Sequence, residues 1–278
     1  MRQAHATAKS TEPLRSFERT SRHPGPLMPH PLAAIVIFGL MGAIVGSFLA
    51  AVSVRLPRDE SVVGGRSRCR ACERPLAPWH LVPVLSWLAL RGRCGWCGAA
   101  VSPRYLIIEL AAAAIGVWAA LHGSGWLMIT ATAILGWQLL LIAVVDAEHL
   151  WLPDALTVPL IATGLAFNAA ITGGWPWSQM VGLAAGFGSL WLLGRLYRRL
   201  RGREGLGGGD PILFAGAGAW IGWTGLPSVV LLASGIGLGL VAARLMLRRP
   251  VAAADRLPFG SLLAAGLWLT WLYGPLGY

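Results

Sequence analysis

The sequence predicts an all-α membrane protein with about eight transmembrane helices. Of its 278 residues, 55% are hydrophobic and only 13% are charged, about half the charged fraction of an ordinary soluble domain. Apolar windows of about 20 residues, each long enough to cross a bilayer as a helix, recur along the chain. The connections between them differ sharply in charge, which is typical of a chain that crosses a membrane repeatedly.

The predicted spans follow one another from residue 31 onward. The first thirty residues are polar and basic, so we expect a disordered tail, or an upstream extension with Met28 as the start, and not a cleaved signal peptide. Residues 31–54 form the first expected transmembrane helix. The seven further apolar stretches are 105–122, 126–145, 155–172, 178–194, 211–223, 227–247 and 259–275.

The arginines predict which side each connection faces. Residues 55–104 hold nine arginines, 194–204 hold five and 244–256 hold four, whereas "HGSG", "TGGWPW" and "TGLP" carry no charge. With eight spans, every arginine-rich connection falls on one side, which the positive-inside rule makes the cytoplasmic side. Because the arginines separate apolar segments and do not cover one face of a domain, the net charge of +11 does not indicate nucleic-acid binding.

Acidic residues from two distant segments are expected at that cytoplasmic boundary. Asp210 ends the connection after the fifth span, and "VDAEHLWLPD" after the third offers three partners, namely Asp146, Glu148 and Asp154. Two neighbouring carboxylates share one proton and can serve as base and acid against an amide bond. Spacing alone leaves the partner open. Asp154 has a simpler explanation as a helix N-cap, Glu148 as a solvated charge, and Asp146 directly follows an apolar run.

Four glycines approach Asp210 in "GLGGGD". Glycines such as Gly207 and Gly209 adopt backbone conformations closed to other residues and let a substrate strand come close. A flexible linker would have the same composition, so this observation alone does not decide the function. The segment lacks the strand–turn–helix context of a dinucleotide-binding glycine motif.

All four cysteines lie in the first cytoplasmic connection, as Cys69-x-x-Cys72 and Cys94-x-x-Cys97. Paired C-x-x-C motifs about twenty residues apart are typical of a tetrahedral four-thiolate zinc site. Disulfides are disfavoured in the reducing cytosol. We therefore expect a closed, structural zinc site that staples residues 55–104, a segment too short to hold itself together unaided.

Five segments, in the right order, resemble the type IV prepilin peptidases, a family of GxGD-type membrane aspartic proteases. "GSFLAAVSVRLPR" resembles their first-span motif, and the segment from "SRCRACERP" to "YLIIEL" resembles their cytoplasmic zinc loop. "VDAEHLWLPDALTVPL" resembles the surroundings of their first catalytic aspartate, "GLGGGDPILFAGAGAWIG" their GxGD segment, and "LPFGSLLAAG" the start of their last helix. The resemblance covers about residues 42–268.

This resemblance implies a membrane-embedded aspartic endopeptidase of the bacterial inner membrane. Such enzymes remove the basic leader from type IV prepilins or type II secretion pseudopilins at the cytoplasmic face. By motif position, the resemblance implies Asp146 and Asp210 as the catalytic pair, with Gly207 and Gly209 in the loop through which substrate approaches. Many members then N-methylate the new N-terminus with S-adenosylmethionine. Prepilin or pseudopilin substrates and the lipid bilayer are the expected partners.

Three positions depart from the family pattern. Ala50 and Leu81 stand where the family usually has asparagine, in segments associated with methyl transfer. Ile212 stands where the family usually has a lysine, two residues after the GxGD aspartate. Neither catalytic aspartate is affected, so the expected departure concerns methyl transfer more than peptide cleavage.

The predicted organisation has four parts: the tail at 1–30, the first span at 31–54, the zinc-binding loop at 55–104, and a membrane-embedded aspartic peptidase domain at 105–278. Two alternatives belong to other classes of protein. A transporter would place acidic residues near the middle of the membrane, whereas the acids here lie at the ends of apolar stretches. An assembly scaffold built around the zinc loop would need neither Asp146 nor Asp210. Substituting these two aspartates separates the three hypotheses.

Overall fold

The computed structural model describes residues 30–62, 64, 66–203, 205–248 and 257–277. The expected tail, apart from His30, lies outside these residues, as does the part of the arginine connection 244–256 that follows residue 248. The described part of the chain contains no strand and is all-α, as predicted. Its long helices are α1 (Pro31–Arg55), α3 (Pro103–His122), α4 (Trp126–His149), α5 (Asp154–Thr172), α6 (Trp177–Arg201), α7 (Asp210–Met246) and α8 (Phe259–Tyr273).

Six of the described helices are long and apolar enough to cross a membrane: α1 together with the short helix η1 (Leu56–Arg58), then α3, α4, α5, α6 and α7. Helix α8 is equally apolar but has 15 residues. The outer faces of the helices expose large aliphatic side chains, with Leu40 at 65% and Leu238 at 71% exposed. Continuous exposed apolar faces are rare on soluble monomers and suit a lipid environment. The chain is therefore a multi-pass membrane protein.

Helix α7 corrects the expected count of separate helices. It contains both the sixth and the seventh predicted stretches, 211–223 and 227–247, and the uncharged "TGLP" connection between them is helical. Gly222 interrupts the helical backbone with φ 72° and ψ −178°, a conformation that only glycine adopts without steric cost. Helix α7 therefore consists of two arms, and the eight predicted stretches occupy seven long helices.

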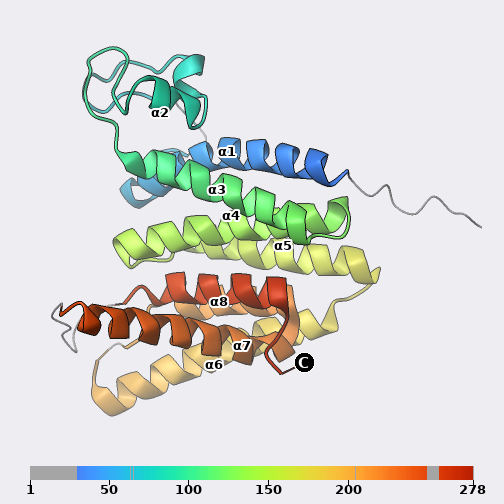
Figure 1. Ribbon diagram of the computed structural model, residues 1–278. Helices are drawn as coiled ribbons and strands as arrows, with labels where there is room; N and C mark the ends of the chain where they lie inside the picture. The colour runs from blue at the N-terminus through green and yellow to red at the C-terminus, as the bar shows by residue number, and fades with distance from the viewer. Residues whose placement is uncertain (1–29, 63, 65, 204, 249–256, 278) are drawn as a thin grey trace, which may run out of the picture.

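The two arms of α7 run in opposite directions. Helix α8 packs antiparallel to the second arm, with Gly266 against Val229 and Leu262 against Gly237. The starts of α8 and of the first arm both lie beside Leu152. The second arm therefore returns to the end of the bundle from which the first arm leaves, as Figure 1 shows.

The helices form three groups side by side. Helices α1 and α3 pack together on one side, α4 and α5 lie in the middle, and α6, α7 and α8 lie on the other side (Figure 1). Helix α4 is the most buried of the six candidate spans, because it contacts α3 and α1 on one side and α8 and α5 on the other. Its last turn therefore lies between the two outer groups.

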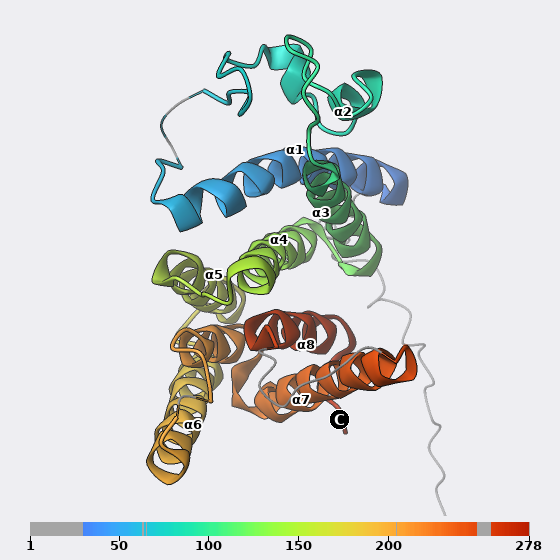
Figure 2. The same ribbon diagram turned by 90° about the vertical axis from the view of Figure 1, so that its left-hand side faces the viewer.

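Small residues bring α1 and α3 into close contact. A methyl group on Gly42 would overlap the backbone carbonyl of Ala112, and one on Gly46 would lie 2.7 Å from Cα of Glu109. This glycine pair, four residues apart, lets the two backbones approach, as is common between membrane helices. The segment between α1 and α3 contains η2 (Pro78–Leu81) and α2 (Leu85–Ala89) and lies outside the bundle, beside one end of α1 and α3 (Figure 2).

Candidate active site and metal centre

Asp146 lies in the last turn of α4, is only 5% exposed, and is held by the start of α8. Its Oδ2 accepts a hydrogen bond of 2.6 Å from the backbone N–H of Ser261 and one of 3.0 Å from the Ser261 hydroxyl. The first backbone N–H groups of a helix have no partner within the helix, so a carboxylate is a natural acceptor there. Gly260 leaves room for this contact, because a methyl group there would lie 3.0 Å from Asp146 Cγ.

Asp210 is the first residue of α7 and is 4% exposed. Its Oδ2 accepts a hydrogen bond of 2.9 Å from the backbone N–H of Gly207. The glycine segment thus folds back on the carboxylate that it precedes. A negative charge in the first turn of a helix is also favoured by the helix dipole.

The structure places Asp146, in the last turn of α4, and Asp210, in the first turn of α7, at the same end of the bundle. Leu152 lies against both Gly209, which precedes Asp210, and Gly260, which lies beside the Asp146 carboxylate. Among the described residues, no donor reaches Oδ1 of either carboxylate. Within the part of the chain that the structure describes, each aspartate is therefore anchored through its Oδ2.

The two competing acids lie elsewhere. Asp154 is exposed and is the first residue of α5, while Pro153 occupies the N-cap position and no side-chain cap bond forms. The expected capping role is therefore wrong, although the first-turn charge still suits the helix dipole. Glu148 is not a solvated loop charge either, because it belongs to the last turn of α4 and forms an ion pair with Arg104.

Gly209 is required by space and not by an unusual backbone conformation. Its φ is −84° and its ψ is −18°, which any residue can adopt. A methyl group on Gly209 would, however, lie 2.5 Å from Cβ and 2.6 Å from the carbonyl O of Leu152. At Gly207 a methyl group would lie 3.0 Å from Asp210 Oδ2, whereas at Gly208 it would meet nothing within 4 Å.

Sequence reasoning did not identify Ser261, although the segment "LPFGSLLAAG" was among the matched motifs. Its hydroxyl donates to Asp146 and also lies 2.9 Å from the carbonyl O of Ala143 in the same helix. One hydroxyl proton can serve one acceptor at a time, while the Ser261 N–H always points at Asp146. The role of Ser261 follows from its place at the N-terminus of α8, opposite a buried carboxylate of α4. This arrangement can be seen only once the helices are packed.

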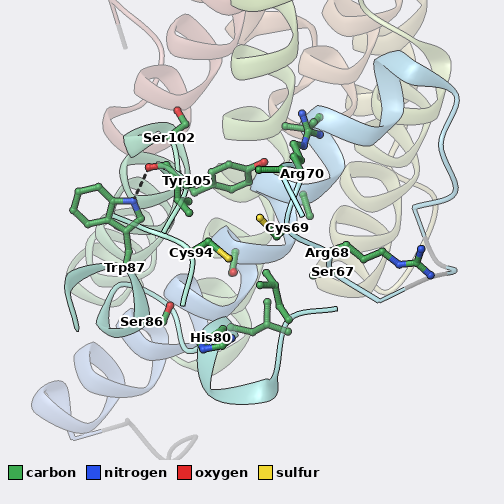
Figure 3. A pocket seen from close by; sticks show the side chains of 18 of the residues that line it. Ser67, Arg68, Cys69, Arg70, His80, Ser86, Trp87, Cys94, Ser102 and Tyr105 are labelled. Carbon is green, nitrogen blue, oxygen red and sulfur yellow. Dashed lines mark hydrogen bonds between the residues drawn. The ribbon is translucent and has the colours of Figure 1, made fainter. Parts of the chain in front are cut away.

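The four cysteines converge into a site that can hold a metal ion. The sulfur atoms of Cys69, Cys72, Cys94 and Cys97 all lie within 4.8 Å of one another, and Sγ of Cys69 and Sγ of Cys97 are 3.8 Å apart. Figure 3 shows the side chains of Cys69 and Cys94 beside each other. Tetrahedral zinc with Zn–S bonds of about 2.3 Å separates its sulfur ligands by about 3.8 Å. The donor set and its spacing therefore fit such an ion.

The two C-x-x-C segments fold in the same way. The N–H of Cys69 donates to the carbonyl of Arg74, and the N–H of Cys94 donates to the carbonyl of Ala99. A residue with positive φ closes each turn at the equivalent position, Glu73 in the first and Gly98 in the second. This shared pattern directs the cysteine side chains of both segments toward one point.

Without a metal ion, the thiols cannot all ionise. The backbone N–H groups of Cys72 and Ala71 lower the pKa of the Cys69 thiol to about 6. At Cys97 the N–H of Ala99 lowers the pKa, but burial and the three other thiols outweigh it and raise the pKa to about 11. Thiolates repel one another at this spacing. A bound divalent cation compensates their negative charges and allows all four to be deprotonated.

A cavity of about 1150 Å³ lies between the cysteine segment and the helices α1 and α3. Its lining is rich in arginine, including Arg68, Arg70 and Arg93, and it also contains the aromatic side chains Trp87 and Tyr105 (Figure 3). Glu109 of α3 lines it as well, is 8% exposed, and accepts a hydrogen bond from the N–H of Val84. The cavity thus offers cationic, anionic and aromatic groups together.

A multi-pass helical protein that buries two carboxylates together at one end of its bundle has the architecture of a membrane-embedded aspartic peptidase. The chain belongs to the type IV leader peptidase family. The model of that family matches residues 133–242, and the model of the bacterial peptidase A24 N-terminal domain matches residues 40–123. The family that the sequence motifs resemble is thereby confirmed.

Curated relatives cover most of the chain. A protein of Pseudomonas aeruginosa is 35% identical over 274 residues, covering 89% of this chain and 93% of the relative. Proteins of Aeromonas hydrophila and Burkholderia pseudomallei are 36% and 38% identical, covering 86% and 84% of this chain and 90% and 84% of the relatives. All three are named prepilin leader peptidase/N-methyltransferase. No solved structure matches the chain.

Proposed function

We propose that this protein is a prepilin peptidase whose catalytic pair is Asp146 and Asp210, and that it cleaves the basic leader from type IV prepilins or type II secretion pseudopilins. The observation that carries this proposal is the convergence of two almost fully buried aspartates, from helices α4 and α7, beside Leu152. A transporter or a scaffold gives no reason for this pair at the end of the bundle. Family membership and the names of the relatives agree with peptidase chemistry.

The two aspartates would act as a base and an acid. The ionised carboxylate takes a proton from water as the water oxygen attacks the scissile carbonyl carbon. The protonated carboxylate then gives its proton to the leaving amide nitrogen as the C–N bond breaks, leaving a leader carboxylate and a free amine. Ser261 and the Gly207 N–H keep one oxygen of each carboxylate in place during this exchange, which conserves the reactive geometry.

The proposed location is the bacterial inner membrane, with the active site at the cytoplasmic face. The ends of α1 and α6, next to which the arginines cluster, lie at the same end of the bundle as the end of α4 and the start of α7, which carry Asp146 and Asp210 (Figure 1). The positive-inside rule assigns that end to the cytoplasm. The apolar helix of a prepilin would lie along the exposed faces of the spans. Its basic leader would then stay at the cytoplasmic surface.

For the cysteine site we propose zinc in a structural role. Four thiolates in a closed set leave no coordination position for water or substrate. The ion would be held by Cys69, Cys72, Cys94 and Cys97. Its binding would stabilise the folded conformation of residues 55–104, which are too few to form a hydrophobic core of their own. Under this proposal residues 55–104 form the zinc-binding loop, and residues 105–278 form the peptidase domain.

Replacing Cys94 with serine is expected to remove the zinc and to destabilise the loop. Metal analysis of the purified protein should show about one zinc ion per chain in the wild type and a small fraction of that in the variant. Protein yield should fall more than the cleavage rate per folded molecule, because no cysteine contacts the two aspartates. Ser86→Ala, which alters the same cavity without removing a ligand, is the control. Unchanged zinc content in Cys94→Ser would contradict the proposal.

We further propose that the enzyme N-methylates the new N-terminus with S-adenosylmethionine, as the names of its relatives indicate. S-adenosylmethionine supplies an electrophilic methyl group when bound. The cavity between the cysteine-containing loop and the helices α1 and α3 would be its binding site. The arginines of the cavity would bind its carboxylate, Glu109 would bind its ammonium group, and Trp87 or Tyr105 would stack on its adenine. The enzyme's part is to hold the donor and the substrate amine together.

Co-expression with a prepilin tests both activities in one measurement. Mass spectrometry of the product should show loss of the leader and an N-terminal residue heavier by about 14 Da, the mass of a methyl group replacing hydrogen. A cleaved but unmethylated product would contradict the methyl transfer and would point to Ala50 and Leu81 as the positions responsible. Uncleaved prepilins of both the pilus and the secretion type would contradict the peptidase assignment.

A further inference from the structure

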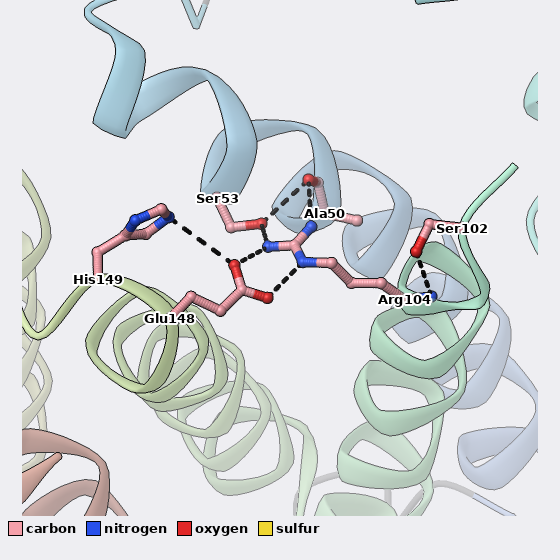
Figure 4. Close-up of polar contacts among 6 residues, drawn as sticks. All are labelled: Ala50, Ser53, Ser102, Arg104, Glu148 and His149. Atoms are coloured by element: carbon pink, nitrogen blue, oxygen red, sulfur yellow. Dashed lines mark hydrogen bonds and ion pairs between the residues drawn. The ribbon is translucent and has the colours of Figure 1, made fainter. Parts of the chain in front are cut away.

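The last turn of α4 is held on two sides, but only one side belongs to the active site described above. Residues two apart in an α-helix point about 200° away from each other. Asp146 faces Ser261 of α8, and Glu148 faces the opposite direction, where it meets Arg104 of α3. Figure 4 shows this second contact at the junction of α1, α3 and α4.

The contact between Arg104 and Glu148 is a two-point ion pair. Nε of Arg104 donates to Oε1 of Glu148 at 2.5 Å, and Nη2 donates to Oε2 at 2.7 Å. The two side chains are 22% and 38% exposed. Paired, parallel hydrogen bonds from a guanidinium fix geometry far better than a single contact between exposed charges.

Arg104 also reaches α1, so its guanidinium joins three helices. Nη2 donates to the Ser53 hydroxyl at 2.8 Å, and Nη1 lies 3.5 Å from the carbonyl O of Ala50. The Ser53 hydroxyl in turn donates to the same carbonyl at 3.0 Å. On the other side, Nε2 of His149 lies 3.9 Å from Glu148 Oε2.

Neither charge is where the stability of its own helix would place it. Arg104 is in the first turn of α3, where the helix dipole disfavours a cation, and Glu148 is in the last turn of α4, where it disfavours an anion. Their favourable contacts are instead mainly with each other, and for Arg104 also with Ser53 of α1. This placement favours a role in joining the two helices over a role within either one.

We propose that Arg104 and Glu148 are positioning residues, which fix the last turn of α4 and thereby the carboxylate of Asp146 relative to Asp210. Arg104 lies two residues after Ser102, the N-cap of α3, whose hydroxyl accepts from the Arg104 N–H. Ser102 is the last residue before α3 of the segment that contains the four cysteines. The ion pair therefore also connects that segment to the helix that bears Asp146. This inference rests on the proposed peptidase function, because it assigns the pair to the geometry of that reaction.

Charge reversal at each position and at both positions tests the inference. Cleavage of a purified prepilin should be measured in detergent or nanodiscs for Arg104→Glu, Glu148→Arg and the double variant. Each single change should lower kcat about 10- to 100-fold with KM nearly unchanged, because displacing a reacting group by about 1 Å costs up to about 10²-fold. The double variant restores an ion pair of reversed sign and should recover most of kcat.

Arg58→Glu is the matched control. Arg58 lines the small cavity of about 220 Å³ beside Arg104 and Glu148 and forms no ion pair with any residue that the structure describes. The same change of charge at this position should leave kcat at the wild-type value. Arg104→Lys, which keeps the charge but loses the two-point contact, should fall between wild type and Arg104→Glu.

Hydrogen exchange gives a readout that does not depend on activity. The N–H of Leu150 donates to the carbonyl of Asp146, so amides of residues 146–150 should exchange faster in each single reversal and return toward wild type in the double variant. Single variants with wild-type kcat and exchange, or a double variant as impaired as either single one, would overturn the inference. An inactive wild type would instead refute the proposed function.

Discussion

Asp146→Asn and Asp210→Asn are each expected to abolish leader cleavage, with a loss of about 10³-fold or more. Asparagine keeps the size of the side chain and can still accept the hydrogen bonds from Ser261 or Gly207. It can neither take a proton from water nor return one to the leaving nitrogen. Expression and membrane insertion should be unchanged, because both positions keep their packing. Cleavage of a purified prepilin by each variant, at equal enzyme concentration, is the measurement.

The double variant should be hardly worse than either single one. Groups that act as one unit lose their function together, so their losses do not multiply. Asp154→Asn is the control, because that side chain is exposed at the start of α5 and takes no part in the pair. Wild-type cleavage by Asp210→Asn would contradict the peptidase assignment. An inactive Asp154→Asn together with an active Asp146→Asn would mean that Asp154, and not Asp146, is the partner of Asp210.

Gly209→Ala is expected to lower cleavage about 10²-fold. The added methyl group would lie 2.6 Å from the backbone carbonyl of Leu152, and a backbone atom cannot rotate away as a side chain can. Either the glycine segment or the α4–α5 connection must move, and Asp210 is the next residue. The loss should appear in kcat, measured with the same prepilin.

The glycines beside it provide graded controls. Gly208→Ala should keep wild-type activity, because its methyl group meets nothing within 4 Å. Gly207→Ala should lose less than Gly209→Ala, since its methyl group lies 3.0 Å from a side-chain oxygen of Asp210, which has some freedom to shift. Equal losses in all three variants would show that the segment needs flexibility as such, and not space at Gly209.

Several features of the protein could be predicted from composition and local pattern. Apolar stretches predicted long helices at nearly the observed positions, because a membrane span must be continuous in sequence to satisfy its own backbone hydrogen bonds. The cysteine spacing predicted two C-x-x-C turns, because each turn is a local structure, and the composition of the pairs suggested that they would meet in a four-sulfur cluster. The expected break between the sixth and seventh spans was displaced, since a chain reversal at Gly222 depends on one backbone conformation that hydropathy does not register.

The sequence by itself determined the class of the protein, the helices and the two C-x-x-C pairs, because each depends on residues close together along the chain. Motif resemblance indicated the pair of Asp146 and Asp210, while spacing left three partners open. Only the tertiary structure decided how that pair is held, by Ser261, Gly207 and the room around Leu152, and that Glu148 meets Arg104. These contacts join residues between three and 115 positions apart in sequence, and the long-range ones exist only because helix packing brings separate helix ends together.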